Sequence, residues 1–227
     1  MIEFDLTRHT VRALNQRLHL LPPETNERSW RILNPRGAHA IAAGLTVPVE
    51  ILVEGHVGYY CGGMNKAAMI TVSGHAGTGI GENMMSGSIR VEGNASQSAG
   101  ASGRGGMLIV QGEASARCGI SMKGIDIVVG GSVGHMSCFM GQAGTLVICG
   151  DADHDLGDSL YEAEIFVAGK VASLGADCIE REMDEAHVET VASLLDSARM
   201  KGDPRRFRRY GSARKLYNFH IDHAGQY

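Results

Sequence analysis

The chain has 227 residues with a formal net charge of −4, and 31 of the residues are glycine against only five prolines. Glycine is therefore about twice as frequent as its usual ~7%, but the lack of a Gly-X-Y period excludes collagen. Hydrophobic residues make up 44%, which excludes a disordered linker. No apolar stretch approaches the roughly 20 residues of a membrane span.

The N-terminus and the cysteines indicate a cytoplasmic protein. The first residues mix acids and bases and lack the apolar core of a signal peptide. The five cysteines are odd in number and form no CxxC pair, which favours reduced thiols over a disulfide framework. We therefore expect a cytoplasmic location.

Residues 1–40 show no repeat, and we expect them to cap the N-terminal end of the repetitive region that follows. Residues 41–49 read as an irregular first coil of that region. The repeat itself extends to about residue 178, so the sequence predicts three parts, namely 1–40, 41–178 and 179–227.

A 19-residue repeat dominates the middle part. Its most regular column is formed by Gly55, Gly74, Gly93, Gly112, Gly131, Gly150 and Gly169. The residues four before, two before and two after each glycine are apolar, which predicts a short strand followed by a bend. One such unit cannot bury its own apolar side, so we expect about seven units to stack in parallel, ~4.8 Å apart.

Further glycines follow the first column at fixed distances. They are Gly58 and Gly77 three residues later, and Gly62, Gly81, Gly100, Gly119 and Gly157 seven residues later. We expect all these glycines to be structural. Each is predicted to turn a corner with positive φ or to allow stacked backbones to approach closely.

The handedness of the solenoid is predicted by excluding two other solenoid folds. A left-handed hexapeptide solenoid needs an apolar residue at every sixth position, but the column that includes Tyr59, Thr78 and Gln97 is polar and mixed. A calcium-binding roll needs aspartate in each nonapeptide, and the second to fourth coils contain none. The sequence therefore predicts an all-β fold, a right-handed parallel β-helix.

The last part is predicted to hold an α-helix and a basic tail. Val188, Val191, Leu195 and Ala198 follow helical spacing, and Gly202 and Pro204 are expected to end the helix. Residues 201–217 carry a charge of +6, which leaves −10 on the rest of the chain. This split predicts that the tail docks on an acidic partner subunit, because the negative body would repel nucleic acid. The predicted interface residues are Arg205, Arg206, Arg208, Arg209, Tyr217 and Phe219.

Three clusters resemble chemical sites, but each has a simpler interpretation. The glycine-rich segment 77–81 leads into another strand and not into the helix that a nucleotide site requires. The pairs His56/His75 and His135/His154 share columns but lack the third ligand that a zinc site needs. Asp151, Asp153, Asp155 and Asp158 lack the spacing of a calcium loop. We therefore predict no catalytic, cofactor-binding or metal-binding residue on this chain.

The spacing G-xx-G-xxx-G is complete in Gly55-Gly58-Gly62 and in Gly74-Gly77-Gly81. Over residues 41–176 this lattice resembles the GXGXG-motif β-helix at the C-terminus of the glutamate synthase large subunit. It is also similar to the β-helix subunits of formylmethanofuran dehydrogenase and of the formyltransferase/hydrolase complex. Segments 12–15 and 214–220 add to this resemblance. With them, the chain looks most like the small β-helix subunit of N-methylglutamate synthases (methylamine–glutamate N-methyltransferases).

The resemblance implies a non-catalytic structural subunit of a hetero-oligomer. Its partners would be an amidotransferase-like subunit and a synthase-like subunit that carries FMN and an iron–sulfur cluster. The assembly would convert methylamine and glutamate to N-methylglutamate and ammonia. The alternatives are an equivalent scaffold in a formylmethanofuran-type C1 complex and, third, a stand-alone solenoid enzyme acting on polysaccharide.

Overall fold

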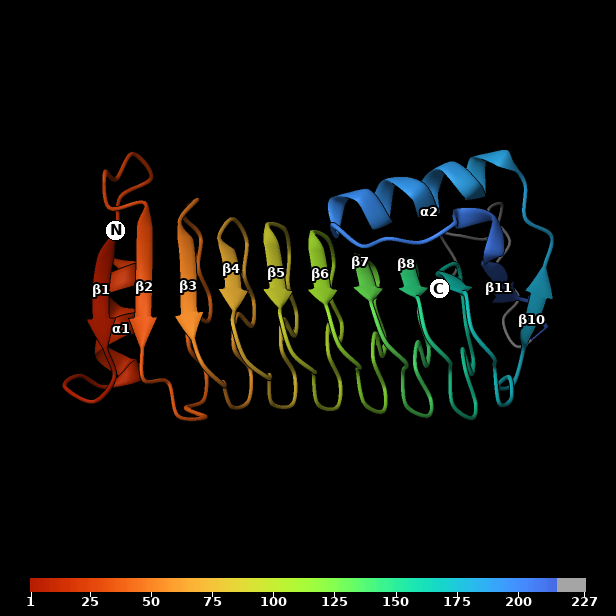
Figure 1. Cartoon of the computed structure of the whole chain (residues 1–227), viewed down its shortest axis with the longest axis horizontal. Coiled ribbons are helices and arrows are strands. Elements are labelled where there is room, and N and C mark those ends of the chain that lie inside the picture. The colour runs from red at the N-terminus through yellow and green to blue at the C-terminus, as the bar shows by residue number, and fades with distance from the viewer. Residues whose placement is uncertain (216–227) are drawn as a thin grey trace, which may run out of the picture.

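The computed structural model describes residues 1–215 and shows a parallel β-helix. Tyr217 and Phe219 of the predicted interface lie outside the described residues. In the described part of the chain the sheet has 11 strands, in the order β1-β2-β3-β4-β5-β6-β7-β8-β9-β11-β10 (Figure 1). Seven parallel strands belong to the repeat: β3 (Glu50–Glu54), β4 (Met69–Val72), β5 (Ser88–Val91), β6 (Met107–Val110), β7 (Lys123–Val129), β8 (Ala143–Ile148) and β9 (Glu164–Val167).

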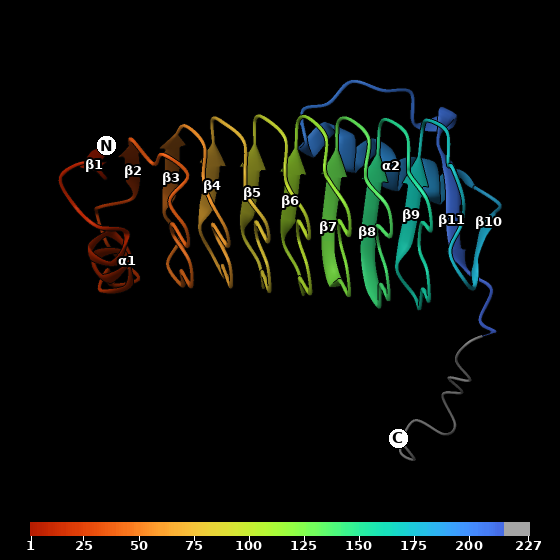
Figure 2. The same ribbon diagram turned by 90° about the horizontal axis from the view of Figure 1, so that it is seen from below.

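The predicted right-handed parallel β-helix is confirmed. Strands run down the front of the solenoid in Figure 1, and the chain returns behind them while it advances towards the C-terminal end (Figures 1 and 2). Adjacent strands pair with an offset of 19 residues, as in Ile51 with Ile70 and Ile70 with Ile89. The sequence period is therefore the length of one coil.

The interior is built from the predicted apolar columns. The side chains two residues before each repeat glycine are fully buried: Val53, Val72, Val91, Val110, Val129, Ile148 and Val167. The residue two positions after each repeat glycine forms one parallel backbone bridge with the equivalent residue of the next coil, from Val57 to Val171. β-Branched side chains suit this narrow core because they fill the space between two closely spaced walls.

The two main glycine columns have different physical causes. In the first column, a methyl group on Gly150 would lie 2.6 Å from the carbonyl carbon of Gly131, one coil earlier. In the second, Gly100 has φ +69° and faces inward, where a methyl group would lie 2.6 Å from Ile127 Cδ1. Close backbone approach therefore explains the first column from Gly74 onwards, whereas Gly55 has φ +129°, and a left-handed inward corner explains the second column.

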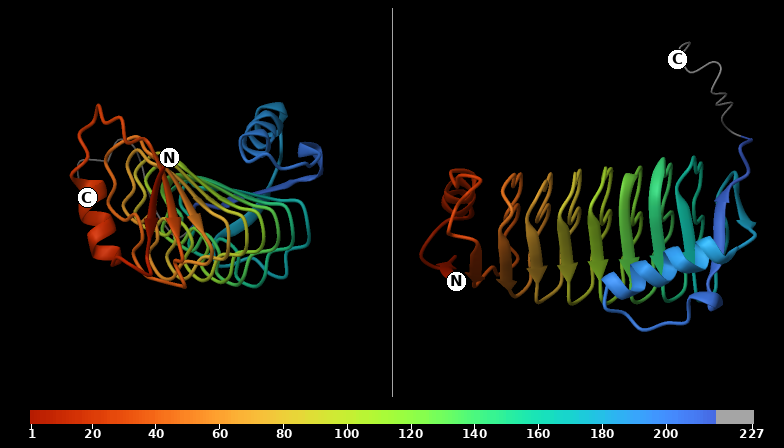
Figure 3. Two further views of the ribbon diagram at one scale, coloured as in Figure 1. Left: turned by 60° about the vertical axis from the view of Figure 1, so that its left-hand side comes forward. Right: turned by 90° about the horizontal axis from the view of Figure 1, so that it is seen from above.

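The N-terminal part contributes strands β1 (Ile2–Asp5) and β2 (Ser29–Leu33) and helix α1 (Val11–His19). β2 pairs in parallel with β3, so the sheet begins well before residue 41. The pairing of Trp30 with Ile51 has an offset of 21 residues, which hides these strands from a search for a 19-residue period. Helix α1 closes this end of the core with the fully buried Leu14 and Leu18 (Figure 3).

The C-terminal part contains β10 (Cys178–Arg181), helix α2 (Glu185–Ser197), a short 3₁₀ helix (Pro204–Arg206) and β11 (Arg208–Ser212). The helix agrees with the predicted helical spacing. The strand β11 was not predicted: it runs antiparallel between β9 and β10 and buries Tyr210. A five-residue strand that carries two arginines offers too little alternation to be found from sequence.

Candidate functional site

The glycine-rich segment 77–81 is a structural corner. Three of its five amide groups are bound to neighbouring coils: the N–H of Gly77 donates to Val57 O, that of Gly79 to Gln97 O and that of Gly81 to Cys61 O, at 2.9–3.0 Å. The chain then continues to β5 without a helix. A phosphate cradle needs adjacent free N–H groups at the start of a helix, whereas here the three glycine N–H groups bind carbonyls and no helix follows.

The histidine pair His56/His75 forms part of a ladder along one edge of the solenoid. The two rings stack with centroids 4.9 Å apart. The N–H of His75 donates to His56 Nδ1, and the N–H of Asn94 donates to His75 Nδ1, both at 2.9 Å. Each side chain thus satisfies the backbone of the next coil, and Nδ1 has no free lone pair for a metal.

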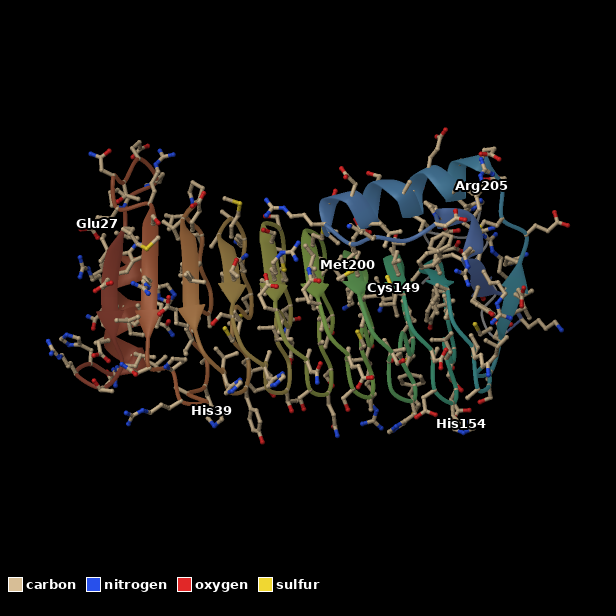
Figure 4. The ribbon with its side chains drawn as sticks, in the orientation of Figure 1. Glu27, His39, Cys149, His154, Met200 and Arg205 are labelled. Atoms are coloured by element: carbon tan, nitrogen blue, oxygen red, sulfur yellow. The ribbon has the colours of Figure 1, made fainter. Side chains whose placement is uncertain are left out.

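His154 of the second histidine pair lies at the lower edge of the solenoid in Figure 4 and is exposed, as are its pair mate and three of the four aspartates. Asp153 accepts from the N–H of His154 at 2.8 Å, and Asp151 accepts from the N–H of Lys170 at 2.7 Å. Asp158 accepts from Ser159 Oγ at 2.7 Å and from the N–H of Ala176 at 3.1 Å. Within residues 1–215 no group of three or more His, Cys, Asp or Glu side chains is placed to hold a metal ion.

All five cysteines are free thiols, and four of them are buried. Burial raises the pKa of Cys61 and Cys118 to about 12, and burial with help from Asp177 and Asp158 does the same for Cys178. Burial also raises the pKa of Cys138 and of the half-buried Cys149. Protonated thiols are poor nucleophiles, and the four buried cysteines belong to the hydrophobic core.

This burial predicts slow alkylation. At pH 8, we expect iodoacetamide to label Cys149 first and to spare the four buried thiols until urea unfolds the chain, as read by mass spectrometry. In the unfolded state the thiols lose their protons from about pH 9, whereas in the folded state the buried thiols keep them. The free energy of unfolding should therefore fall as the pH rises from 9 towards 12. Rapid labelling of Cys61 in the native protein would contradict the assigned burial.

The basic tail is paired with acids of the same chain. Arg205 binds both carboxylate oxygens of Glu185 at 2.8 Å, Arg209 Nε lies 2.9 Å from Glu164 Oε1, and Arg208 lies 3.6 Å from Glu180. Arg214 pairs similarly with Glu162 at 2.9 Å. The uneven charge distribution therefore has an explanation within the chain. The sequence indicated this charge split but not which acids would meet the arginines.

Arg209 and Arg206 form a matched pair for testing this network. Arg209 is largely buried and also donates to Glu182 O, whereas Arg206 is exposed and has no ion pair within residues 1–215. We expect Arg209→Ala to lower the free energy of unfolding by roughly 1–2 kcal/mol and Arg206→Ala by less than about 0.5 kcal/mol, as measured by urea denaturation. Equal effects would show that the ion pairs do not hold β11.

A hollow of about 500 Å³ lies on the outer face of the sheet, between the N-terminus and the end of α2. We call it the outer shelf and define it by Leu52, Met69, Thr71, Arg90 and Met107. Arg90 Nη2 donates to Ala198 O at 2.6 Å and so binds the C-terminal end of α2. The sequence analysis missed this surface. Its signal is the column three residues before each repeat glycine, which is apolar from Ile109 onwards and mixed before it.

The fold and these clusters define a class: a parallel β-helix in which the glycine lattice, the histidine ladder and the buried thiols are all parts of the framework. The chain belongs to the GlxC family. It is 58% identical to Protein GlxC of Rhizobium meliloti (strain 1021) over 224 residues, which cover 98% of each chain. No family model matches the sequence, and no solved structure matches it. Neither helix within residues 1–215 is long and apolar enough to cross a membrane.

Proposed function

We propose that the chain is a non-catalytic structural subunit of a glutamate synthase-like enzyme complex. The glycine lattice carries this proposal, because its spacing resembles the β-helix of the glutamate synthase large subunit over about seven coils. The lattice is architectural in both settings, so the resemblance transfers a scaffold and no active-site residue. The candidate clusters support the same interpretation, since their polar atoms are engaged in holding coils together.

The specific complex that we propose is the cytoplasmic N-methylglutamate synthase. In it, an amidotransferase-like subunit and a synthase-like subunit with FMN and an iron–sulfur cluster would convert methylamine and glutamate to N-methylglutamate and ammonia. A rigid solenoid suits the work of holding two such subunits in register. Each coil is hydrogen-bonded to its neighbours along the whole axis, which resists bending and shear.

Purification of the tagged chain from its source organism, followed by mass spectrometry, tests this proposal. We expect stoichiometric recovery of an amidotransferase-like and a flavin-containing synthase-like subunit, with N-methylglutamate formed from methylamine and glutamate by the complex. The isolated chain should show no turnover. Recovery of a molybdopterin or tungsten subunit would instead indicate the C1-transfer complex, and turnover of a sugar polymer by the chain alone would indicate a solenoid enzyme.

A further inference from the structure

We propose that the outer shelf binds an amphipathic helix of a partner subunit, seated in line with α2. The inference rests on the proposed function, which supplies the partner, and adds the surface and the kind of element that meets it. The argument begins from α2, which shows how this sheet holds a helix.

Helix α2 lies along the solenoid axis and covers the outer face of one half of the sheet (Figures 1 and 3). Under it, the outward side chains of β6 to β9 are Ile109, Val128, Val147 and Phe166, all buried in one cluster with Val191 and Leu195. Four strands at ~4.8 Å measure about 19 Å, which matches a helix of 13 residues at 1.5 Å per residue.

The outward-facing column continues beyond the end of α2, with mixed side chains in place of wholly apolar ones. Each of the strands β2 to β5 contributes one residue to this outward column, namely Arg31, Leu52, Thr71 and Arg90. No helix within residues 1–215 covers these strands. Because the solenoid repeats by translation, these four strands offer the same length, about 19 Å. A second helix of about 13 residues therefore fits end to end with α2.

The side chains of the shelf define the chemistry of this helix. Leu52 and Thr71 are half-buried on the floor, and Met69 is 50% exposed at the rim. Exposed methionines adapt to apolar partners and are enriched at protein interfaces. The incoming helix should therefore present apolar side chains at i, i+3 or i+4, and i+7 to this floor.

The two ends of the outer shelf differ in charge. Arg31, at the far end, is already paired with Glu3 and Glu54. At the end near α2, Arg199 is exposed and forms no ion pair in the described part of the chain, and Arg90 lies 4.0 Å from Glu92. An acidic residue at the end of the partner helix that faces α2 would complement this positive end.

Met69 and Met64 provide a matched test. Met64 precedes β4 and is 55% exposed, and Met69 is the first residue of β4 and is 50% exposed. Only Met69 lines the outer shelf. With the partner subunits recovered from the purified complex, we expect Met69→Glu to weaken binding at least tenfold and Met64→Glu less than twofold, by biolayer interferometry. Arg199→Glu should also weaken binding, whereas Arg117→Glu, at an exposed arginine that does not line the shelf, should not. Unchanged melting temperatures would show that the four variants fold.

Photo-cross-linking identifies the occupant. With p-benzoylphenylalanine at position 69, we expect cross-links to one face of a helix in a glutamate synthase-like subunit, and none from position 64. Cross-links to a second copy of the chain would overturn the shelf proposal while leaving the complex intact. Equal binding of the partner subunits by Met69→Glu and Met64→Glu would do the same. Failure of the wild-type chain to co-purify with these subunits would contradict the proposed function as well.

Discussion

Val110→Asp should unfold the chain. Val110 lies in the central column of the core and is fully buried between Val91 and Val129 of the neighbouring strands. Burying a valine stabilises the fold by about 1.5–3 kcal/mol, and a carboxylate in its place would have no partner in an apolar interior. We expect a total loss of roughly 4 kcal/mol or more, a large share of the stability of a typical domain.

Circular dichroism and thermal melting measure this loss. Ser115→Asp is the control, since Ser115 is exposed in the turn after β6 and should accept the same side chain at little cost. A Val110→Asp variant that melts at the wild-type temperature would show that the column does not face the core.

Gly150→Ala should destabilise the solenoid although it adds only one methyl group. The new carbon would lie 2.6 Å from the carbonyl carbon of Gly131 and 2.7 Å from the backbone nitrogen of Ser132. Backbone atoms of a hydrogen-bonded neighbouring coil cannot rotate away as a side chain can. We expect a cost of about 2–3 kcal/mol, which lowers the melting temperature by about 5–10 °C for a chain of this size.

Gly211→Ala is the matched control. Gly211 is buried in β11, but a methyl group there would approach Arg181 Cγ at 3.6 Å, an ordinary contact. We expect its melting temperature to stay within about 2 °C of the wild type. If both variants melted alike, close backbone approach would not explain the first glycine column.

The parts of the fold that repeat could be predicted, because seven copies of one pattern reveal which positions face inward. A single coil would not have distinguished Val110 from any other apolar residue in a short strand. The same reasoning could not find β2, since Trp30 is 21 residues before its partner Ile51. It could not find β11 either, because that strand occurs once and runs in the opposite direction.

The surfaces were harder to predict than the core. The charge split correctly marked the tail as basic, but the acids that meet it, such as Glu164 and Glu185, are brought near only by folding. The outer shelf depends on where α2 ends over the sheet, and Arg90 meets that end through its contact with Ala198 O, across 108 positions of sequence. Contacts between residues so far apart leave no local periodicity to read.

Within residues 1–215 the outermost strands are β1 and β10, and they explain how a fold made of similar layers stays finite. A repetitive sheet that ended in a regular coil would be a template on which the next molecule could continue, giving open-ended filaments. Here each outermost strand has only four residues, with Glu3 and Asp5 on one and Glu180 and Arg181 on the other. The antiparallel β11 also interrupts the parallel order before the last strand. The number of layers in the sheet is thus limited by the edge strands that the chain itself supplies.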